Sequence, residues 1–240
     1  MSLWNILSQT KMNNQNEFKL SSIGVIHTAF KQKLSIPRQP GLAPSAQGII
    51  KLNSDYARED TLRGLESFDY LWIFFWCHAS NSWRETVKPP RLGGKEKVGV
   101  FATRSPHRPN PIGLSAVKLE RITSDFELIV SGIDILDQTP ILDIKPYIHM
   151  WDSHPNASLG WINKQPDMPV YAVKWEDKIQ KQELPISLVQ IISETLKFNP
   201  RPAYDKSLNR HYTHQVDEFD ITWSFDGEVV WINDVLRCDN

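Results

Sequence analysis

The sequence has 240 residues, of which 40% are hydrophobic and 23% charged, so it can build one large domain or a medium domain with a small appendage. That composition excludes a disordered tail and a single tiny module. Lys and Arg number 27 against 28 Asp and Glu, so the net charge of −1 by itself indicates neither a nucleic acid nor an acidic partner.

The distribution of charge is more informative than its sum. Residues 81–121 hold 9 basic and 3 acidic side chains, whereas residues 122–240 hold 10 basic and 19 acidic ones. A stretch this basic predicts a local positive surface that could face phosphate groups, unless folding disperses it over a solvated face.

The cysteines and the N-terminus indicate the compartment. Cys77 and Cys238 stand far apart without metal-ligand spacing, so we expect no disulfide and no zinc site, and reduced thiols in the cytoplasm. No stretch has the length of a membrane span, and the N-terminus lacks a signal-peptide core. Residues 1–17 are expected to form a flexible leader, because the run 12–16 is polar and has little to bury.

Residues 18–160 are expected to form a mainly β domain. The apolar positions of 55–65 follow helical spacing and predict the one helix there, and the continuous apolar run 70–76 predicts a fully buried strand. Closely spaced strands with little helix favour a β-barrel or a sandwich over a doubly wound sheet. Six segments carry the strand pattern: 18–29, 70–76, 98–101, 114–122, 126–130 and 133–136.

Residues 161–240 are expected to form a small α+β domain. Strands are predicted over 170–175, 218–225 and 228–233, and Asp226-Gly227 predicts a hairpin with a type I′ turn between the last two. A helix is predicted over 185–198, starting near Pro185, with its apolar stripe formed by Ile186, Val189, Ile192 and Leu196.

Two Pro-rich loops have the composition of binding sites. In Pro37-Arg38-Gln39-Pro40-Gly41 the prolines stiffen a loop that offers a guanidinium and an amide, although a crossover with Arg38 in a surface salt bridge would look the same. Residues 101–115 hold three prolines, two arginines, a histidine and an asparagine. Prolines reduce the entropy lost on ordering a loop, so this density favours a binding loop.

Two further segments leave their role open. Carboxylates at 134, 137 and 143 lie among aliphatic residues and need partners if they are enclosed. Asp143 and Lys145 face the same side of an extended segment, as a simple ion pair or as part of a site. Asn199-Pro200-Arg201-Pro202-Ala203-Tyr204 directly follows the second helix and by itself is typical of a proline helix stop. The sequence contains none of the glycine fingerprints of nucleotide-binding folds and no HExxH motif.

Together these motifs resemble the TsaA-like family, and NPRPAY at 199–204 is similar to the C-terminal signature of the TrmO tRNA methyltransferases. The resemblance runs from about residue 18 almost to the C-terminus, and four long motifs in the same order are far more specific than one short pattern. The motifs that carry it are PRQPG at 37–41, LRGLESF at 62–68, FATRSPHRPNPIGLS at 101–115 and DxTPILDIKPY at 137–147.

The resemblance implies a β-barrel-like N-terminal domain that binds S-adenosylmethionine, a small C-terminal domain and a homodimer. It also implies methylation of N6 of N6-threonylcarbamoyladenosine, the nucleoside 3′ of the anticodon in threonine tRNA. Ala79 and Gln138 stand where the family often has Gln and Gly, which leaves Ala79 a backbone role. The cofactor pocket implied by motif matching consists of Pro37, Arg38, Gln39, His78, Ala79, Arg108, Lys118 through its backbone, Gln138, Thr139, Pro140 and Ile141.

The resemblance further implies a site around the target base, formed by Asp143, Lys145, Arg201 and Tyr204. We hypothesise that Asp143 or Tyr204 is the general base, and that Arg104 or Arg201 pairs with a substrate carboxylate or a phosphate. From the basic stretch, Arg84, Lys88 and Arg91 are expected to help hold tRNA. The alternatives are a methyltransferase of the same fold with another substrate, and a module that senses S-adenosylmethionine or RNA without turnover.

Overall fold

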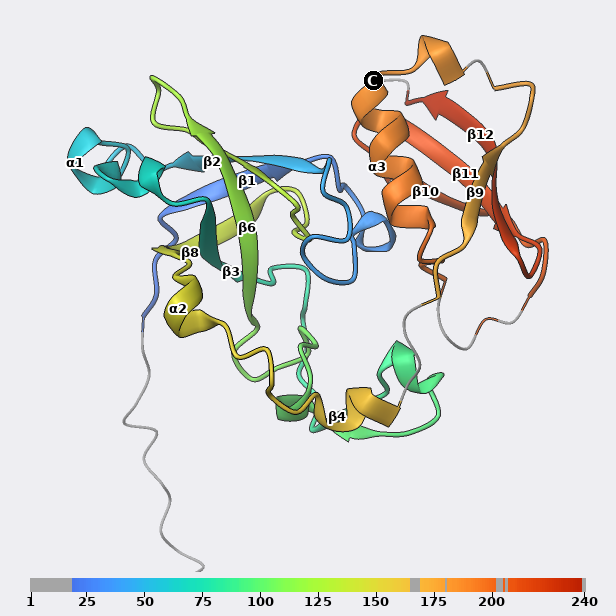
Figure 1. Cartoon of the computed structure of the whole chain (residues 1–240), viewed down its shortest axis with the longest axis horizontal. Coiled ribbons are helices and arrows are strands. Elements are labelled where there is room, and N and C mark those ends of the chain that lie inside the picture. The colour runs from blue at the N-terminus through green and yellow to red at the C-terminus, as the bar shows by residue number, and fades with distance from the viewer. Residues whose placement is uncertain (1–18, 165–168, 180, 202–204, 206, 239–240) are drawn as a thin grey trace, which may run out of the picture.

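The structure consists of a β-barrel and a smaller sheet covered by one helix (Figure 1). It is a computed structural model that describes residues 19–164, 169–179, 181–201, 205 and 207–238. The strand pattern left a barrel and a sandwich open and the resemblance implied a barrel; the structure is a closed barrel with the strand order β1-β2-β7-β6-β3-β8. Its strands are β1 (Gly24–Thr28), β2 (Gln47–Leu52), β3 (Tyr70–Trp76), β6 (Ile112–Ile122), β7 (Leu128–Ser131) and β8 (Thr139–Pro146).

Strand β3 has the predicted bounds, but the prediction that it is fully buried is wrong. Leu71 and Ile73 are fully buried, whereas Tyr70 is 46% exposed. A barrel strand has one face toward the core and one toward the outside, so alternate residues of even a continuous apolar run point outward. Part of the apolar surface of β3 is therefore available to other contacts.

Other elements of the barrel region also differ from the sequence expectations. Strands β2 and β8 were not predicted, and two predicted strands are absent or shortened. Residues 133–136 form a loop, and Ile133 and Ile135 are buried in it without strand pairing. The predicted strand 98–101 ends at β5 (Val98–Gly99), which pairs with β4 (Thr86–Val87). Short 3-10 helices cover Lys33–Ser35, Leu65–Ser67, Pro90–Leu92, Val100–Ala102, Gly160–Lys164 and Lys181–Glu183.

The helices of the barrel region are short. The helix expected over 55–65 is reduced to one turn, α1 (Glu59–Leu62), and Gly64, with φ of +85°, ends it before the next 3-10 turn. One more helical turn, α2 (His149–Asp152), follows β8. The site must therefore be built from strand ends and loops.

The smaller sheet has the order β10-β11-β12-β9, with β9 (Ala172–Trp175) parallel to β12 (Val229–Arg237). Strand β10 (Tyr212–Val216) was not expected, and it pairs with β11 (Phe219–Phe225). The predicted hairpin at Asp226-Gly227 joins β11 and β12, but its type I′ turn is wrong, because Gly227 has a positive φ and Asp226 does not.

Helix α3 (Ile186–Leu196) begins after Pro185 as predicted, but its apolar stripe is rotated from the prediction. Ile186, expected in the stripe, is 77% exposed. The buried positions recur at helical spacing and include a threonine, whose hydroxyl donates to the helix backbone. They are Leu188, Ile191, Ile192, Thr195 and Leu196.

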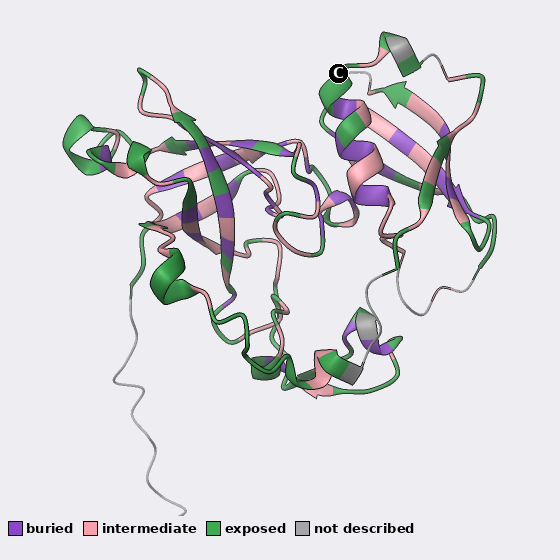
Figure 2. Cartoon of the chain, viewed as in Figure 1, coloured by how far each residue is buried: buried purple, intermediate pink, exposed green. Residues whose placement is uncertain are grey.

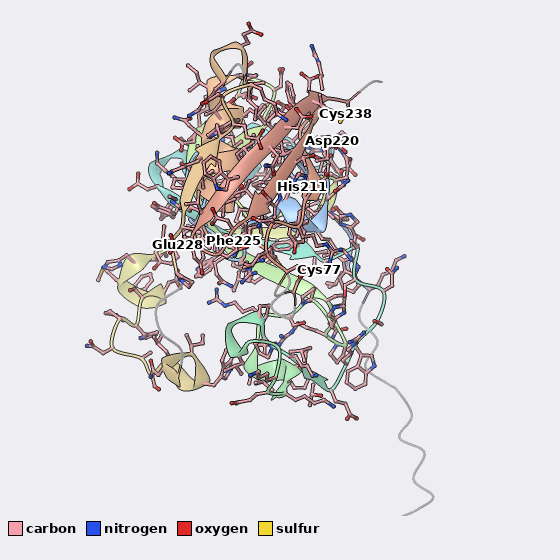
Figure 3. All side chains as sticks on the ribbon, turned by 90° about the vertical axis from the view of Figure 1, so that its right-hand side faces the viewer. Cys77, His211, Asp220, Phe225, Glu228 and Cys238 are labelled. Atoms are coloured by element: carbon pink, nitrogen blue, oxygen red, sulfur yellow. The ribbon has the colours of Figure 1, made fainter. Side chains whose placement is uncertain are left out.

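One apolar cluster continues from the barrel into α3 and the smaller sheet. Phe30 is fully buried and forms an isolated bridge with Val216 of β10. Figure 2 shows buried positions inside the barrel and along α3 and the strands behind it. The two cysteines are free thiols as expected, and Figure 3 shows Cys238 beside Asp220, well away from Cys77. Among the described helices, none is long and apolar enough to cross a membrane.

Candidate functional site

Four sequence segments that were singled out separately meet at one end of the barrel. The Arg104 guanidinium donates to Gln39 Oε1 at 3.0 Å, which joins the loop 101–111 to the loop 37–41. Lys33 Nζ donates to the carbonyl of Ala79 at 2.7 Å. We call Gln39, His78, Ala79, Arg104 and Thr139 the loop cluster. The structure therefore brings several predicted cofactor residues into one place.

The loop cluster fixes the orientation of His78 at the exit of β3. Thr139 Oγ1 lies 2.7 Å from the carbonyl of Leu136 and 3.3 Å from His78 Nδ1. Because the hydroxyl has one proton and donates it to that carbonyl, Nδ1 of His78 must donate in turn. The rest of the His78 side chain is exposed, so its Nε2 is free to contact a ligand.

The turn before β8 keeps a glycine-like backbone although it contains glutamine. Gln138 has φ of +60°, in the left-handed region that favours glycine. Its side-chain amide donates to His27 Nδ1 at 2.9 Å. Next to it, Thr139 and Ile141 are buried, while Pro140 is half-buried. The turn therefore positions the start of β8, and Pro140 and Gln138 are its accessible members.

Two predicted cofactor residues have structural contacts elsewhere. Arg108 donates to the carbonyls of Val100 and Thr103 at 3.1 and 2.7 Å, so it holds the 3-10 turn of its own loop. Lys118 lies on the outer face of β6, with Nζ 3.0 Å from Glu120. That ion pair and its hydrogen bonds raise the pKa of Lys118. Lys118 pairs in register with Tyr70 and Ser131, away from the loop cluster.

Arg38 and Arg201 both contact the segment that follows α3. Arg38 Nη2 donates to the carbonyls of Arg201 and Asn199 at 3.0 and 3.5 Å. Arg201 donates from Nε to Asn199 Oδ1 at 2.9 Å and from Nη1 to the Ser207 carbonyl at 2.7 Å. Its guanidinium also lies 4.3 Å from the centre of the Phe225 ring. These contacts link the loop 37–41 to the smaller sheet.

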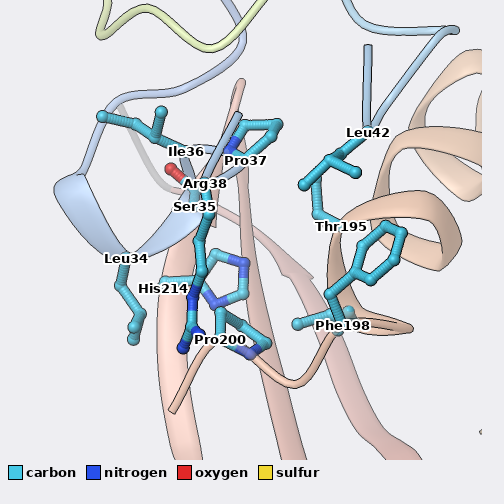
Figure 4. Close-up of a pocket in the computed structure, with 11 residues that line it drawn as sticks. Leu34, Ser35, Ile36, Pro37, Arg38, Leu42, Thr195, Phe198, Pro200 and His214 are labelled. Atoms are coloured by element: carbon cyan, nitrogen blue, oxygen red, sulfur yellow. The ribbon is translucent and has the colours of Figure 1, made fainter. Parts of the chain in front are cut away.

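A narrow crevice runs between the loop 34–42 and α3, and buried Pro37 lies in its wall (Figure 4). His214 of β10 forms its floor and is 1% exposed. Trp223 Nε1 donates to His214 Nδ1 at 3.0 Å. Burial lowers the pKa of His214 to about 4, so the imidazole is neutral. The other lining residues are Leu34, Ser35, Ile36, Arg38, Leu42, Thr195, Leu196, Phe198 and Pro200.

Asp143 and Lys145 form an ion pair on the outer face of β8, with 2.7 Å between Nζ and Oδ2. A bulge places them there: Phe75 pairs with Ile141 but Phe74 pairs with Asp143, which leaves Leu142 as an extra residue. The two side chains do share a face, as the sequence predicts, and lie farther along β8 than the loop cluster.

The remaining predicted residues divide into exposed ones and ones that are not described. Arg84, Lys88 and Arg104 are exposed on the excursion 80–111, and Trp161 Nε1 donates to the carbonyl of Ala102 within the same region. Phe101 is 76% exposed there. Tyr204 and the side chain of Arg91 lie outside the described part of the chain.

Asp134, a carboxylate that needs a partner when it is enclosed, is a candidate for the site in addition to the predicted residues. Ser115 Oγ donates to Asp134 Oδ1 at 2.5 Å. Burial raises the pKa of Asp134 to about 6, against the opposing influence of Ser115 and Arg104. The signal that could have identified Asp134 is its position between Ile133 and Ile135, both buried. Within the described residues, no cluster of His, Cys, Asp and Glu could hold a metal ion.

Comparisons with known proteins extend these observations. Residues 25–153 match the family model described as "tRNA-methyltransferase O N-terminal domain", and residues 168–238 match "TrmO C-terminal domain". The "tRNA (adenine(37)-N6)-methyltransferase" of Escherichia coli is 40% identical over 220 residues, covering 87% of this chain and 93% of the relative.

A sequence relative and a crystal structure from Pseudomonas aeruginosa are also similar. A "putative S-adenosylmethionine-dependent methyltransferase RcsF" is 40% identical over 215 residues, or 86% of this chain and 92% of the relative. The crystal structure of TrmO from that organism superposes with a TM-score of 0.77 at 34% identity, covering 92% of this chain and 98% of the other. Sequence and fold therefore agree over both parts of the molecule.

Proposed function

The chain belongs to the tRNA-methyltransferase O family, and we propose that it transfers the methyl group of S-adenosylmethionine to N6 of N6-threonylcarbamoyladenosine in threonine tRNA. The observation that carries the proposal is the match to both family models in order, together with 40% identity to a relative named as a tRNA (adenine(37)-N6)-methyltransferase. The modified adenosine would lie next to the anticodon, and we place the enzyme in the cytoplasm with its substrate.

The chemistry of the loop cluster fits S-adenosylmethionine. The cofactor carries a carboxylate, an ammonium, a sulfonium and an adenine, which call for a cation, an anion and amide-like hydrogen-bonding groups. The loops offer the Arg104 guanidinium, the amide of Gln39 and the half-buried carboxylate of Asp134. We propose that Gln39, His78, the backbone of Ala79 and the 138–141 turn hold the cofactor, while Arg38 and Arg108 hold the surrounding loops.

When bound, S-adenosylmethionine supplies an electrophilic methyl group for an in-line displacement by nitrogen. The protein must hold the acceptor in line and receive the N6 proton, because that nitrogen lies between a purine ring and a carbonyl. Within the described part of the chain, Asp143 is the candidate base, and the Lys145 ammonium at 2.7 Å holds its carboxylate in place. Tyr204 is the alternative base suggested by its motif.

The exposed basic side chains support a tRNA surface on the excursion 80–111. Among the ion pairs between described residues, none involves Arg84, Lys88 or Arg104. Phosphate groups of an anticodon loop are suitable partners for such cations, and splayed bases can stack on exposed aromatic rings such as Phe101. Arg91 is included among the proposed tRNA-binding residues because it lies in the same basic stretch of the sequence.

We also propose that the enzyme is a homodimer. Support comes from apolar side chains exposed on the outer face of β3 and β6 and on α2, a distribution typical of protein interfaces. These are Tyr70 at 46%, Ile112 at 39%, Leu114 at 47%, Met150 at 81% and Trp151 at 69% exposure. Light scattering coupled to gel filtration measures the mass, and a monomer at micromolar concentration would contradict the proposal.

The test of function is methyl transfer from labelled S-adenosylmethionine to total tRNA that does or does not carry threonylcarbamoyladenosine, followed by nucleoside mass spectrometry. We expect label on the modified adenosine in the carrying pool alone. Label on another nucleoside would instead indicate a methyltransferase with a different substrate. Cofactor binding without label in either pool would favour a sensing module.

The role of Asp143 has a separate test. Asp143→Asn removes the proton acceptor but keeps the shape of the side chain, so we expect turnover with saturating cofactor to fall by at least roughly 100-fold. The matched control is Asp152→Asn, on α2, whose carboxylate accepts from Trp72 Nε1 at 3.0 Å. Unchanged turnover in Asp143→Asn would remove Asp143 from the role of base.

A further inference from the structure

Asp134 is a half-buried carboxylate at the end of the barrel where the loop cluster lies. It belongs to the loop between β7 and β8, and its flanking residues Ile133 and Ile135 are buried in the barrel core. Ser115 of β6, itself 1% exposed, donates to Oδ1 at 2.5 Å. Neighbours on two sides thus fix the position of this carboxylate.

The groups around Asp134 leave its negative charge incompletely compensated. Arg104 acts on it electrostatically, but the Arg104 guanidinium donates its hydrogen bond to Gln39. Cys77, at the exit of β3, has its pKa raised to about 11 by burial and by Asp134, so the thiol is neutral. Arg108 acts on Cys77 from the same side but donates to backbone carbonyls of its own loop.

Asp134 differs in this respect from the other two carboxylates of its segment. Asp137 has Lys31 Nζ at 2.9 Å and accepts from the Thr28 amide at 2.8 Å. Asp143 has Lys145 at 2.7 Å. Of the ion pairs between described residues, none includes Asp134. A partly enclosed carboxylate without a close cation is costly, unless a ligand provides the cation.

We propose that Asp134 is the counter-ion for a positively charged group of S-adenosylmethionine, its sulfonium or its ammonium. This inference rests on the proposed function, because it takes the loop cluster as the cofactor site. Asp134 lies in the loop that leads directly to Thr139 of that cluster. It is also close enough to Arg104, which contacts Gln39, to interact with it electrostatically. Ser115 is then a positioning residue that holds the carboxylate toward the ligand.

The test uses three ligands that differ in charge. S-adenosylmethionine has both cations, S-adenosylhomocysteine has the ammonium alone, and 5′-methylthioadenosine has neither. Binding of each to the full-length protein and to Asp134→Asn is measured by calorimetry at pH 7.5, without tRNA. We expect the variant to bind S-adenosylmethionine at least about tenfold more weakly and 5′-methylthioadenosine unchanged, as loss of a charge-assisted contact requires.

The second ligand identifies the cation. A parallel loss for S-adenosylhomocysteine supports the ammonium, and a loss confined to S-adenosylmethionine supports the sulfonium. Unchanged affinity for S-adenosylmethionine, or an equal loss for all three ligands, would overturn the inference. The matched control is Asp125→Asn, the same substitution at an exposed turn between β6 and β7, which should leave all three affinities unchanged.

A second variant tests the inference if Asp134→Asn does not fold. Ser115→Ala keeps the carboxylate but removes the hydrogen bond that lowers its pKa, so the pKa of Asp134 should rise. Relative to the unmodified protein, affinity for S-adenosylmethionine should then fall more at pH 6 than at pH 8. An identical pH profile for the two proteins would contradict the role of Asp134.

The outcome is separable from that of the proposed function. If no tRNA is methylated while Asp134→Asn selectively loses affinity for the charged ligands, the proposed reaction fails and the binding assignment stands. If modified tRNA is methylated and the charge of the ligand has no influence on the variant, the assignment of Asp134 alone fails.

Discussion

The buried pair of His214 and Trp223 shows how a single residue makes stability depend on pH. Trp223 Nε1 donates to His214 Nδ1 at 3.0 Å beneath the crevice beside α3. Both side chains are essentially inaccessible, at 1% and 0% exposure. The acceptor nitrogen must stay unprotonated to keep this bond, so protonation of the imidazole at low pH would break it.

Acid should therefore destabilise the protein through His214. The folded pKa of about 4 lies below the ordinary 6.5, so the unfolded chain takes up a proton there that the folded one does not. The stabilisation is complete above pH 6.5 and is lost as the pH falls toward 4, up to about 3 kcal/mol. Urea unfolding at pH 7 and pH 4.5 measures it.

His214→Phe provides the comparison. The variant should be less stable at neutral pH by about 1–3 kcal/mol, because the Trp223 N–H loses its buried acceptor. It should also lose less stability on acidification than the unmodified protein. The pKa of Asp134 is raised to about 6, so this residue makes both proteins more stable as the pH falls, opposite to the effect of His214. The difference between the two proteins in stability lost on acidification therefore reports His214. Equal losses in the two proteins would contradict the assignment.

At the scale of elements, strand β6 approaches β3 closely at one glycine. Gly113 pairs in register with Phe75, and a Cβ atom there would lie 2.2 Å from the Phe75 ring. Such a contact is impossible without movement, so the ring packs where a side chain would otherwise be. This close approach explains why a glycine stands at this position of the strand.

Gly113→Ala should consequently strain the β3–β6 pair. We expect a loss of about 1–3 kcal/mol in the free energy of unfolding, as overpacking typically costs, together with a lower melting temperature. Phe75→Leu in the same chain should restore part of that loss, because it removes the clashing ring atoms. Alanine at Gly99, where a Cβ would meet nothing within 4 Å, is the control.

The elements also show what a sequence can predict. The bounds of β3, the start of α3 and the β11–β12 hairpin follow from local patterns, and these were correct. The predicted α3 stripe was correct at Ile192 and Leu196 but wrong at Ile186, because burial depends on which side of the helix its neighbours cover. A strand was predicted over 133–136 because apolar residues alternate there. In the structure these residues have no pairing strand, so they form a loop although Ile133 and Ile135 are buried.

The candidate site shows the same limit. Family motifs identified Gln39, His78 and Thr139, and the structure brings them together. Two contacts between distant segments could not be predicted from the sequence. The bulge at Leu142 turns Asp143 outward, and Asp134 accepts a hydrogen bond from Ser115 of a different strand. Such contacts depend on the register in which two strands pair, and the sequence of one strand alone does not specify that register.

At the scale of the whole molecule, the barrel loop 37–41 is joined to the C-terminal part through Arg38, which donates to the carbonyls of Asn199 and Arg201. The Arg201 side chain holds that segment in place. Arg201→Lys would lose the donors to Asn199 and Ser207 and the ring contact with Phe225. We expect a stability loss of about 1–3 kcal/mol. Calorimetric unfolding measures it.

Arg210→Lys is the matched control for Arg201. Arg210 is 62% exposed and pairs with Asp205 at 3.0 Å, and surface pairs contribute less than about 1 kcal/mol. Equal effects of the two substitutions would mean that the Arg201 contacts stabilise this segment no more than an exposed ion pair does. A loss of activity without a loss of stability would instead favour a direct contact of Arg201 with substrate.

The charge distribution also acts at this scale. If the excursion 80–111 holds tRNA, the triple variant Arg84→Ala, Lys88→Ala, Arg91→Ala should bind tRNA more weakly, and the slope of log affinity against log salt should fall by about 2. Filter binding at several salt concentrations measures both quantities. An unchanged affinity and slope would exclude this surface.

The control triple variant lies on the opposite side of the barrel, around α1. It combines Lys51→Ala, Arg58→Ala and Arg63→Ala, which remove the same number of positive charges from exposed positions. If the slope of log affinity against log salt falls equally in this variant, net charge rather than the excursion governs tRNA affinity.

The closure of the barrel has a consequence for how the chain folds during synthesis. The first strand, β1, pairs with the last, β8, and Ser22 Oγ donates to the carbonyl of Ile141 across a separation of 119 positions. Closing so long a loop is slow, because its entropy must be lost before the contacts form. We expect the nascent barrel to stay open on the ribosome until β8 has emerged, so that the edge of β1 that pairs with β8 is exposed to chaperones throughout that interval.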